Sequence, residues 1–364
     1  MINVVNLNKD ELERIDAWRG ILVLMIASIH AQQLFLFPYY GLNMGFYIWG
    51  QLANASVLAF FFISGLVIIM SLIINFNKND DKVDLKHYLY SRISRIYPPL
   101  IATMIICYII KFILFKFNML GSHQSFLLPG EQIGIGRDYF MFSRYDVIEF
   151  LKMNKLGFEA VDPSLWTLII EWWMYFFGLF VFMLFTTKKI GLRLFYIVMA
   201  MYMYSKIESN NSYAPVYVSI WVLGGIYLFA KEYRKHFNIV LILLGIIGLC
   251  IAEFGLHIFS LKKDITTQPV VQFSSILIFA GTLFYLPKIK FLQKIGHISY
   301  TLYIIHFPIY LLIFSLLHVY SYKSPMLLFL LFFGSIAVVI AISLWLSKII
   351  ENKNLYYNLL KKYF

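Results

Sequence analysis

The chain has 364 residues, of which 60% are hydrophobic and only 14% are charged, and its mean hydropathy is +0.74. A soluble domain is about half apolar and a quarter charged, so this composition excludes a soluble globular fold and a disordered chain, and the long apolar blocks favour a polytopic membrane protein. The net charge of +12 would suggest nucleic-acid binding in a soluble protein; in a membrane protein it first indicates the basic bias that sets topology, so we expect no nucleic-acid partner.

Ten apolar segments have the length, or nearly the length, of a membrane-spanning helix, which needs about 20 mostly apolar residues. We therefore expect an all-α polytopic membrane protein with about ten transmembrane helices. The predicted spans cover residues 17–37, 52–75, 96–116, 164–185, 191–205, 214–230, 237–256, 269–287, 298–318 and 326–347. The fifth is the shortest of them.

The basic residues predict the orientation of these spans. When the spans alternate across the membrane, most of the 31 Lys and Arg residues fall on the side that holds both termini. Cytoplasmic loops carry an excess of Lys and Arg, so both termini are predicted to be cytoplasmic. An odd number of spans would scramble this alternation, and the pattern therefore supports an even count.

One long loop, residues 117–163, interrupts the hydrophobic pattern. It contains several glycines and charges of both signs, and the predicted topology places it on the extracytoplasmic side. No internal repeat or separate soluble domain is visible, so residues 1–364 are predicted to form one membrane domain. The two cysteines, Cys107 and Cys250, lie in apolar runs, and their spacing predicts neither a disulfide framework nor a metal site.

Two ionisable side chains share one face of the first span. Arg19 and His30 are eleven residues apart, which is nearly three helical turns, so they lie on one stripe of the helix. Ionisable groups inside a span cost free energy and are therefore functional candidates. His30 would act as a general base, and Arg19 would bind an anion or a carboxylate. The alternative is an arginine that reaches the interface and a histidine hydrogen-bonded between helices.

The second span contains a pair of small residues, Ser64 and Gly65, after three phenylalanines. Small side chains let another backbone or a ligand approach closely. Taken alone, this pair favours plain helix packing.

Residues 84–99 form a basic amphipathic stretch for which Asp84 is a suitable N-cap. Arg92 and Arg95 share a face at the predicted cytoplasmic boundary, and such a pair suits phosphate groups. Attraction to lipid headgroups explains the same pattern equally well. Pro98 and Pro99 predict that this helix ends and that the chain turns there into the third span.

The fourth span places a carboxylate among aromatic side chains. Asp162 or Ser164 would cap it, and Glu171 follows about two turns inside, near Trp166 and Tyr175. We expect a functional acid, the alternative being a neutral acid bonded to a neighbouring helix.

The ninth span carries a polar stripe. Ser299, Tyr303 and His306 fall on one helical face, and Pro308 leaves the carbonyl of Ile304 without its helical donor, which allows a kink. The alternative is a structural network between helices.

The order of these motifs along the chain is more specific than any one of them. It runs from Arg19-x10-His30 through Phe-Phe-x-x-Ser-Gly, Arg-x-x-Arg-x-x-Pro and Ser-Leu-Trp-x-Leu-x-x-Glu to Ile-Ser-Tyr-x-x-Tyr-x-x-His. This order resembles the acyltransferase-3 family of integral membrane acyltransferases. The resemblance implies a ten-helix membrane domain that transfers acyl groups, mostly acetyl, from cytoplasmic acyl-CoA to hydroxyls of O-antigen, capsule, exopolysaccharide or peptidoglycan. It also implies the stand-alone carbohydrate O-acetyltransferase type and a location in the bacterial cytoplasmic membrane.

The resemblance also assigns expected roles to residues of this chain. His30 matches the catalytic histidine, Arg19 is its partner in the same motif, and Glu171 matches the acid after the Trp motif. Donor binding is expected from Arg92, Arg95 and Ser64. The side chains expected to line the active site are Trp166, Tyr300, Tyr303 and His306. We expect no metal and no bound cofactor, with acetyl-CoA or another acyl-CoA as the donor substrate.

Several alternatives stay open on sequence alone. The acyl group could pass directly to the acceptor, with His30 as general base, or through an acyl-enzyme on a serine or tyrosine. A glycan transporter or flippase would also contain polar groups inside spans, although no repeated, broken helices are visible. An acyltransferase acting on a lipid or a small molecule is the third alternative. The expected partners are acyl-CoA, a carbohydrate acceptor that contacts the 117–163 loop, and membrane lipid, while the oligomeric state is open.

Overall fold

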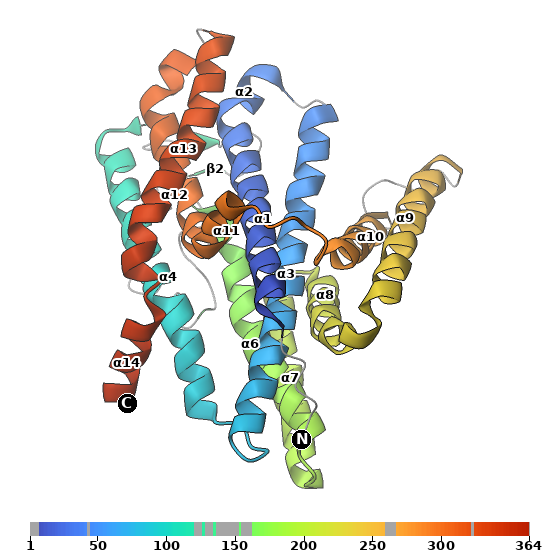
Figure 1. The fold of residues 1–364 in the computed structure, drawn as a ribbon. Helices are drawn as coiled ribbons and strands as arrows, with labels where there is room; N and C mark the ends of the chain where they lie inside the picture. The colour runs from blue at the N-terminus through green and yellow to red at the C-terminus, as the bar shows by residue number, and fades with distance from the viewer. Residues whose placement is uncertain are drawn as a thin grey trace. The chain divides into compact units, whose positions relative to one another are not determined.

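The fold is helical (Figure 1) in the computed structural model, which describes residues 7–41, 44–119, 126–127, 134–135, 153, 162–258, 267–321 and 324–363. The α-helices are α1 (Lys9–Phe35), α2 (Phe37–Tyr40), α3 (Met44–Lys78), α4 (Leu85–Lys116), α6 (Trp166–Thr186), α7 (Ile190–Asn210), α8 (Ala214–Tyr227), α9 (Arg234–Ile258), α10 (Thr267–Thr282), α11 (Lys290–His297), α12 (Ser299–Ser321), α13 (Pro325–Ile350) and α14 (Lys353–Tyr363). The described residues also include two 3-10 helices, η3 (Pro163–Leu165) and η4 (Leu228–Tyr233). The predicted all-α polytopic class is confirmed.

The predicted 117–163 loop lies largely outside the described residues. Its described part includes two short strands, β1 (Phe126–Leu127) and β2 (Gly134–Ile135), which pair antiparallel. The proposed acceptor contact of this loop stays a prediction.

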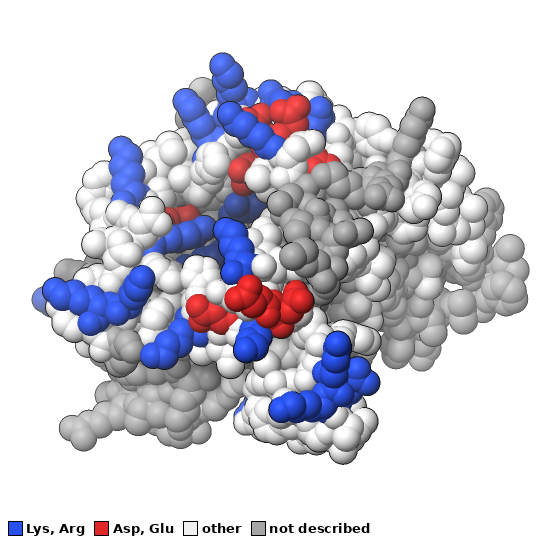
Figure 2. Space-filling view, turned by 60° about the horizontal axis from the view of Figure 1, so that its bottom comes forward, with Lys and Arg blue, Asp and Glu red and all other residues white. Residues whose placement is uncertain are grey.

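Each of the ten predicted spans falls on a helix. Within the described ranges, six helices are long and apolar enough to cross a membrane: Ile48–Lys78, Leu85–Lys116, Trp166–Thr186, Ile190–Asn210, Ser299–Leu317 and Pro325–Tyr363. Three shorter apolar helices match further predicted spans: Ala214–Ala230, His236–Ala252 and Pro269–Thr282. The count of ten and the cytoplasmic position of the termini stay predictions. The face drawn in Figure 2 carries more Lys and Arg than Asp and Glu side chains.

The predicted helix end at Pro98 and Pro99 is wrong, because α4 continues through both prolines. Proline removes a backbone donor, but helices in membrane proteins tolerate it where other groups satisfy the carbonyls that lose their partner. Asp84 is confirmed as the cap of this helix, since its carboxylate accepts a hydrogen bond of 3.0 Å from the His87 amide. The basic stretch and the third span are therefore one continuous element.

The contacts of the chain group it into two units, and each is described by itself. Unit 1 comprises Met1–Leu22, Asn54–Tyr88 and Ile170–Gly296, and unit 2 comprises Val23–Ala53, Leu89–Ile169 and His297–Phe364. Long helices such as α1 and α3 contribute residues to both. The prediction of a single acyltransferase-like domain over residues 1–364 stays a prediction.

In unit 1, α3 and α8 approach each other at backbone contact. A Cβ atom added to Gly65 would lie 1.9 Å from the carbonyl oxygen of Trp221, and one added to Gly224 would lie 2.0 Å from that of Phe62. No side chain fits at either position. The small residue after Ser64 therefore serves helix packing, which was the simpler interpretation of this motif.

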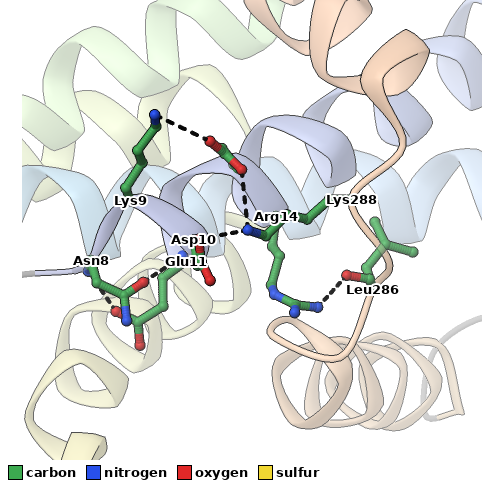
Figure 3. Close-up of polar contacts among 8 residues, drawn as sticks. Asn8, Lys9, Asp10, Glu11, Arg14, Leu286 and Lys288 are labelled. Carbon is green, nitrogen blue, oxygen red and sulfur yellow. Dashed lines mark hydrogen bonds and ion pairs between the residues drawn. The ribbon is translucent and has the colours of Figure 1, made fainter.

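Ion pairs and hydrogen bonds join the start of α1 to the segment between α10 and α11, also in unit 1 (Figure 3). The Lys288 ammonium lies 2.5 Å from a carboxylate oxygen of Asp10 and 3.4 Å from one of Glu13. The Arg14 guanidinium donates to the Leu286 carbonyl at 2.5 Å, and the Trp18 indole N–H donates to the Leu283 carbonyl at 3.0 Å. These contacts join two segments that the predicted topology places on one side of the membrane.

The Asp10–Lys288 ion pair should make a small, pH-dependent contribution to stability. The hydrogen bond and charge of Lys288 lower the pKa of Asp10, and the same pairing raises the pKa of Lys288. The contribution is therefore lost as pH falls through the lowered pKa of Asp10 and as pH rises through the raised pKa of Lys288. It is present between about pH 4 and pH 10.

We expect Asp10→Asn to lower the Tm of the detergent-solubilised protein slightly at pH 7, because the pair is exposed. The difference from the wild type should shrink below about pH 4. Asp81→Asn, at an exposed turn, is the control. An equal effect of Asp10→Asn at pH 7 and at pH 3.5 would contradict the assignment.

In unit 2, the second half of α1 packs along α12. The rings of His30 and Phe307 are 5.4 Å apart, and the ring of Phe35 lies 6.4 Å from Tyr310 and 6.0 Å from Phe314. Because residue numbers increase together along both helices, α1 and α12 run parallel. The next helix, α13, packs against α12 and runs antiparallel to it (Figure 1).

Candidate active site

Two imidazole rings meet in the interior of unit 2. The ring centroids of His30 on α1 and His306 on α12 are 5.2 Å apart, with their planes tilted by 33°. His30 is partly exposed, whereas His306 is completely buried. The structure therefore brings together two histidines that the sequence predicted on separate spans.

Hydrogen bonds at Nδ1 define what each ring can do at Nε2. Nδ1 of His306 lies 2.6 Å from the carbonyl oxygen of Tyr303. A carbonyl oxygen can only accept, so Nδ1 donates and Nε2 carries a lone pair. Nδ1 of His30 lies 2.8 Å from the side-chain oxygen of Gln33, which assigns His30 the same tautomer. In the neutral state, both rings present an unprotonated Nε2.

The side chain of Tyr303, whose backbone carbonyl holds His306, is hydrogen-bonded to the start of α6. The Tyr303 hydroxyl donates to the Ser164 carbonyl at 3.0 Å and lies 2.7 Å from the hydroxyl of Thr167. The Ser164 hydroxyl in turn donates to Asp162 at 2.5 Å. These hydrogen bonds connect η3 and the first turn of α6 to α12 at Tyr303, one turn before His306.

Asp162 ends this network as a buried acid. It caps η3, where its carboxyl oxygen accepts from the Ser164 amide at 3.2 Å, which confirms one of the two predicted caps. Burial raises the pKa of Asp162 to about 8, against the lowering effect of its hydrogen bonds from Ser164. The group is therefore largely protonated at neutral pH, which suits a carboxyl placed away from water.

Comparison with known families decides what kind of protein carries this arrangement. A family model described as an acyltransferase domain matches residues 12–347, which is nearly the whole chain. The chain belongs to the acyltransferase-3 family. No curated protein and no solved structure matches it. The predicted family is thus confirmed, and the protein is a membrane acyltransferase.

The basic pair of the acyltransferase lies in unit 2 on α4. Arg92 is buried and Arg95 is half-buried, one turn before the double proline. The Tyr300 hydroxyl, at the start of α12, donates to the Ile96 carbonyl at 3.4 Å. The Ile-Ser-Tyr motif therefore packs against the helix that carries the basic motif.

Three predicted site residues of the acyltransferase lie in unit 1. Arg19 forms an ion pair of 3.1 Å with Asp16, one turn earlier on α1. Glu171 accepts a hydrogen bond from the hydroxyl of Tyr175. Ser64 is half-buried with its hydroxyl oxygen buried, one residue before the backbone contact of α3 with α8 at Gly65. Their proposed share in a common site with His30 stays a prediction, as do all the assigned roles.

Three residues of the unit 2 cluster went unrecognised in the sequence. Gln33 lies three residues after His30, a spacing that places both on one helical face. Thr167 is the variable residue of the Ser-Leu-Trp-x motif. Tyr310 extends the stripe of α12 by one turn beyond His306, and their rings are 5.8 Å apart.

Trp166, predicted to line the site, begins α6 and is half-buried in unit 2. In the described part of the chain, no group of three or more His, Cys, Asp or Glu residues could hold a metal ion.

Proposed function

We propose that the protein is an O-acyltransferase that moves an acetyl group from acyl-CoA to a hydroxyl of a cell-surface glycan or its lipid-linked precursor. The observation that supports this most directly is the hydrogen bond between His30 and Gln33 in a chain of the acyltransferase-3 family. Gln33 holds Nδ1 of His30, so Nε2 is directed to accept a proton. A partly exposed, oriented imidazole is what a general base requires.

The proposed reaction transfers the acyl group directly. Nε2 of His30 takes the proton of the acceptor hydroxyl as the acceptor oxygen bonds to the thioester carbon. The carbon–sulfur bond breaks, and the leaving thiolate takes the proton from His30. All atoms are accounted for without a further reactant. An acyl-enzyme on a serine or tyrosine would split the same transfer into two steps.

Donor docking is proposed for Arg92 and Arg95. Coenzyme A carries several phosphate charges on a long, thin arm, and guanidinium groups bind phosphate through two parallel hydrogen bonds. The position of both arginines on one face of α4, and the contact of Tyr300 with the same helix, support this role. The family motifs also support a donor contact for Ser64 and catalytic contacts for Arg19 and Glu171.

We expect Arg95→Gln to raise the KM for acetyl-CoA by about 10- to 100-fold, because it removes charge-assisted hydrogen bonds to phosphate. The KM for S-acetylpantetheine, which has no phosphate, should stay the same. Initial rates with both donors measure this difference. Lys86→Gln, an exposed position on the same helix, is the control. An equal rise in KM for both donors would remove the docking proposal.

The function is tested with radiolabel. Membranes containing the protein, and matched membranes without it, receive acetyl-CoA labelled in the acetyl group, and label is counted in glycan after lipid extraction. Transfer into glycan supports the proposal. Label found only in the lipid fraction would favour a lipid acceptor. Movement of a lipid-linked glycan across proteoliposomes without label transfer would favour the transporter alternative.

The proposed location is the bacterial cytoplasmic membrane, with the donor side facing the cytoplasm. The six long apolar helices and the family support an integral membrane position. The acceptor would be reached from the side of the 117–163 loop. No nucleic-acid partner and no bound cofactor are proposed.

A further inference from the structure

Nε2 of His306 is a buried hydrogen-bond acceptor that lies on the ring next to His30, the proposed base. Among the described residues, Nε2 of His306 has no hydrogen-bond partner, although the atom is buried. A buried polar atom left unsatisfied destabilises the fold, and most such atoms in folded proteins are paired. This unpaired Nε2 is therefore unusual, and the ring that carries it lies beside His30.

The burial of the two rings separates their roles. His306 is 0% exposed, so no substrate-sized molecule reaches its Nε2 in this structure, whereas His30 is partly exposed. His306 also cannot turn freely, because Nδ1 is held by the Tyr303 carbonyl. It can therefore influence the reaction only through a neighbour.

That neighbour is neutral before the reaction and positive during it. His30 gains a proton when it deprotonates the acceptor hydroxyl, and the ring of His306 lies 5.2 Å away, centroid to centroid. A neutral imidazole with its lone pair at Nε2 attracts such a charge, and it does so more strongly in a buried site than in water. Before the proton arrives, the same lone pair has nothing to bind.

We propose that His306 is the positioning residue of His30: its unprotonated Nε2 stabilises the His30 imidazolium that forms as the acceptor hydroxyl loses its proton. The inference rests on the proposed function, because it needs His30 to act as a base. Besides His30, the titratable residues that the described part of the chain shows in ring contact with His306 are Tyr303 and Tyr310, both on its own helix. The Tyr303 hydroxyl connects through Ser164 to Asp162.

The test compares two substitutions at one position. His306→Phe keeps a ring of similar size but has no acceptor, and His306→Gln places a side-chain oxygen where it can replace Nε2. Transfer of labelled acetyl into host-membrane glycan is measured from pH 5 to pH 9 at saturating acetyl-CoA. Each variant is first shown to be monodisperse in detergent.

In His306→Phe, we expect kcat at pH 7 to fall about tenfold and the acid limb of the profile to move to lower pH by about one unit. The KM for acetyl-CoA should stay the same, and His306→Gln should recover most of the loss. Ser315→Ala removes a buried hydroxyl elsewhere on α12, where it donates to the Leu312 carbonyl, and should keep the wild-type profile. A merely structural role would not move the pH limb.

An unchanged pH profile in His306→Phe, or a loss confined to KM, would overturn the inference. It would do so without touching the proposed function, provided that His30→Ala abolishes transfer. If His30→Ala and His306→Phe both keep full transfer, the general-base function itself fails. If the wild type transfers no label at all, the acyl-CoA donor proposal fails first.

Discussion

Replacing His30 by alanine should reduce acyl transfer by at least about 10²–10⁴-fold, because a positioned general base contributes that much. The loss should appear in kcat, with the KM for acetyl-CoA nearly unchanged, since the proposed mechanism places the histidine against the reacting hydroxyl and not against the donor phosphates. Label transfer per milligram of monodisperse protein, at saturating acetyl-CoA, is the measurement.

Two further variants sharpen this result. Gln33→Leu removes the acceptor that orients Nδ1 of His30, so it should lose part of the activity while the protein stays folded. His236→Ala changes an exposed histidine of unit 1 and is the matched control. Full transfer by His30→Ala, at matched expression, would contradict the general-base mechanism.

Adding one methyl group to Gly65 should disrupt the fold of unit 1. Its Cβ would lie 1.9 Å from the carbonyl oxygen of Trp221, and backbone cannot move aside as a side chain can. We expect Gly65→Ala to destabilise the protein by about 1–3 kcal/mol or more, as overpacked sites do. Thermal unfolding in detergent and the monodisperse fraction measure it.

A glycine on the same helix provides the control. Gly50 lies in α3, and a Cβ added there would meet nothing within 4 Å. Gly50→Ala should therefore be neutral or stabilise by up to about 1 kcal/mol, through helix propensity alone. If Gly65→Ala and Gly50→Ala showed the same Tm, the close contact of α3 with α8 would be refuted.

Most helices could be predicted from the sequence because hydropathy is a local property. All ten apolar segments fall on helices, and the shortest, 191–205, belongs to the 21-residue α7. Local rules failed at Pro98 and Pro99, where proline reads as a helix end but α4 continues. The amphipathic helices α11 and α14 were also missed, since each has too few apolar residues to be read as a span.

Part of the candidate active site could be predicted because motif order and helical spacing are also local properties of the sequence. His30, Tyr303 and His306 were found from motif order and helical spacing, and the structure gathers these three in unit 2. The role of Gln33 could not be predicted, because a glutamine three residues after a histidine orients the ring only if its oxygen faces Nδ1, and the structure alone shows that it does. The roles of Arg19, Ser64 and Glu171 in unit 1 depend on the family motifs.

The sequence alone determined the class of this protein. Its composition excluded a soluble fold, and its motif order identified the acyltransferase-3 family, because both are carried by residue types and spacings along the chain. Tertiary structure decided the chemistry of the histidines. The proton of His306 is placed locally, by the Tyr303 carbonyl three residues earlier on α12, but the position of the ring beside His30 depends on α1 packing along α12. That contact joins residues far apart in the chain, so no local pattern contains it.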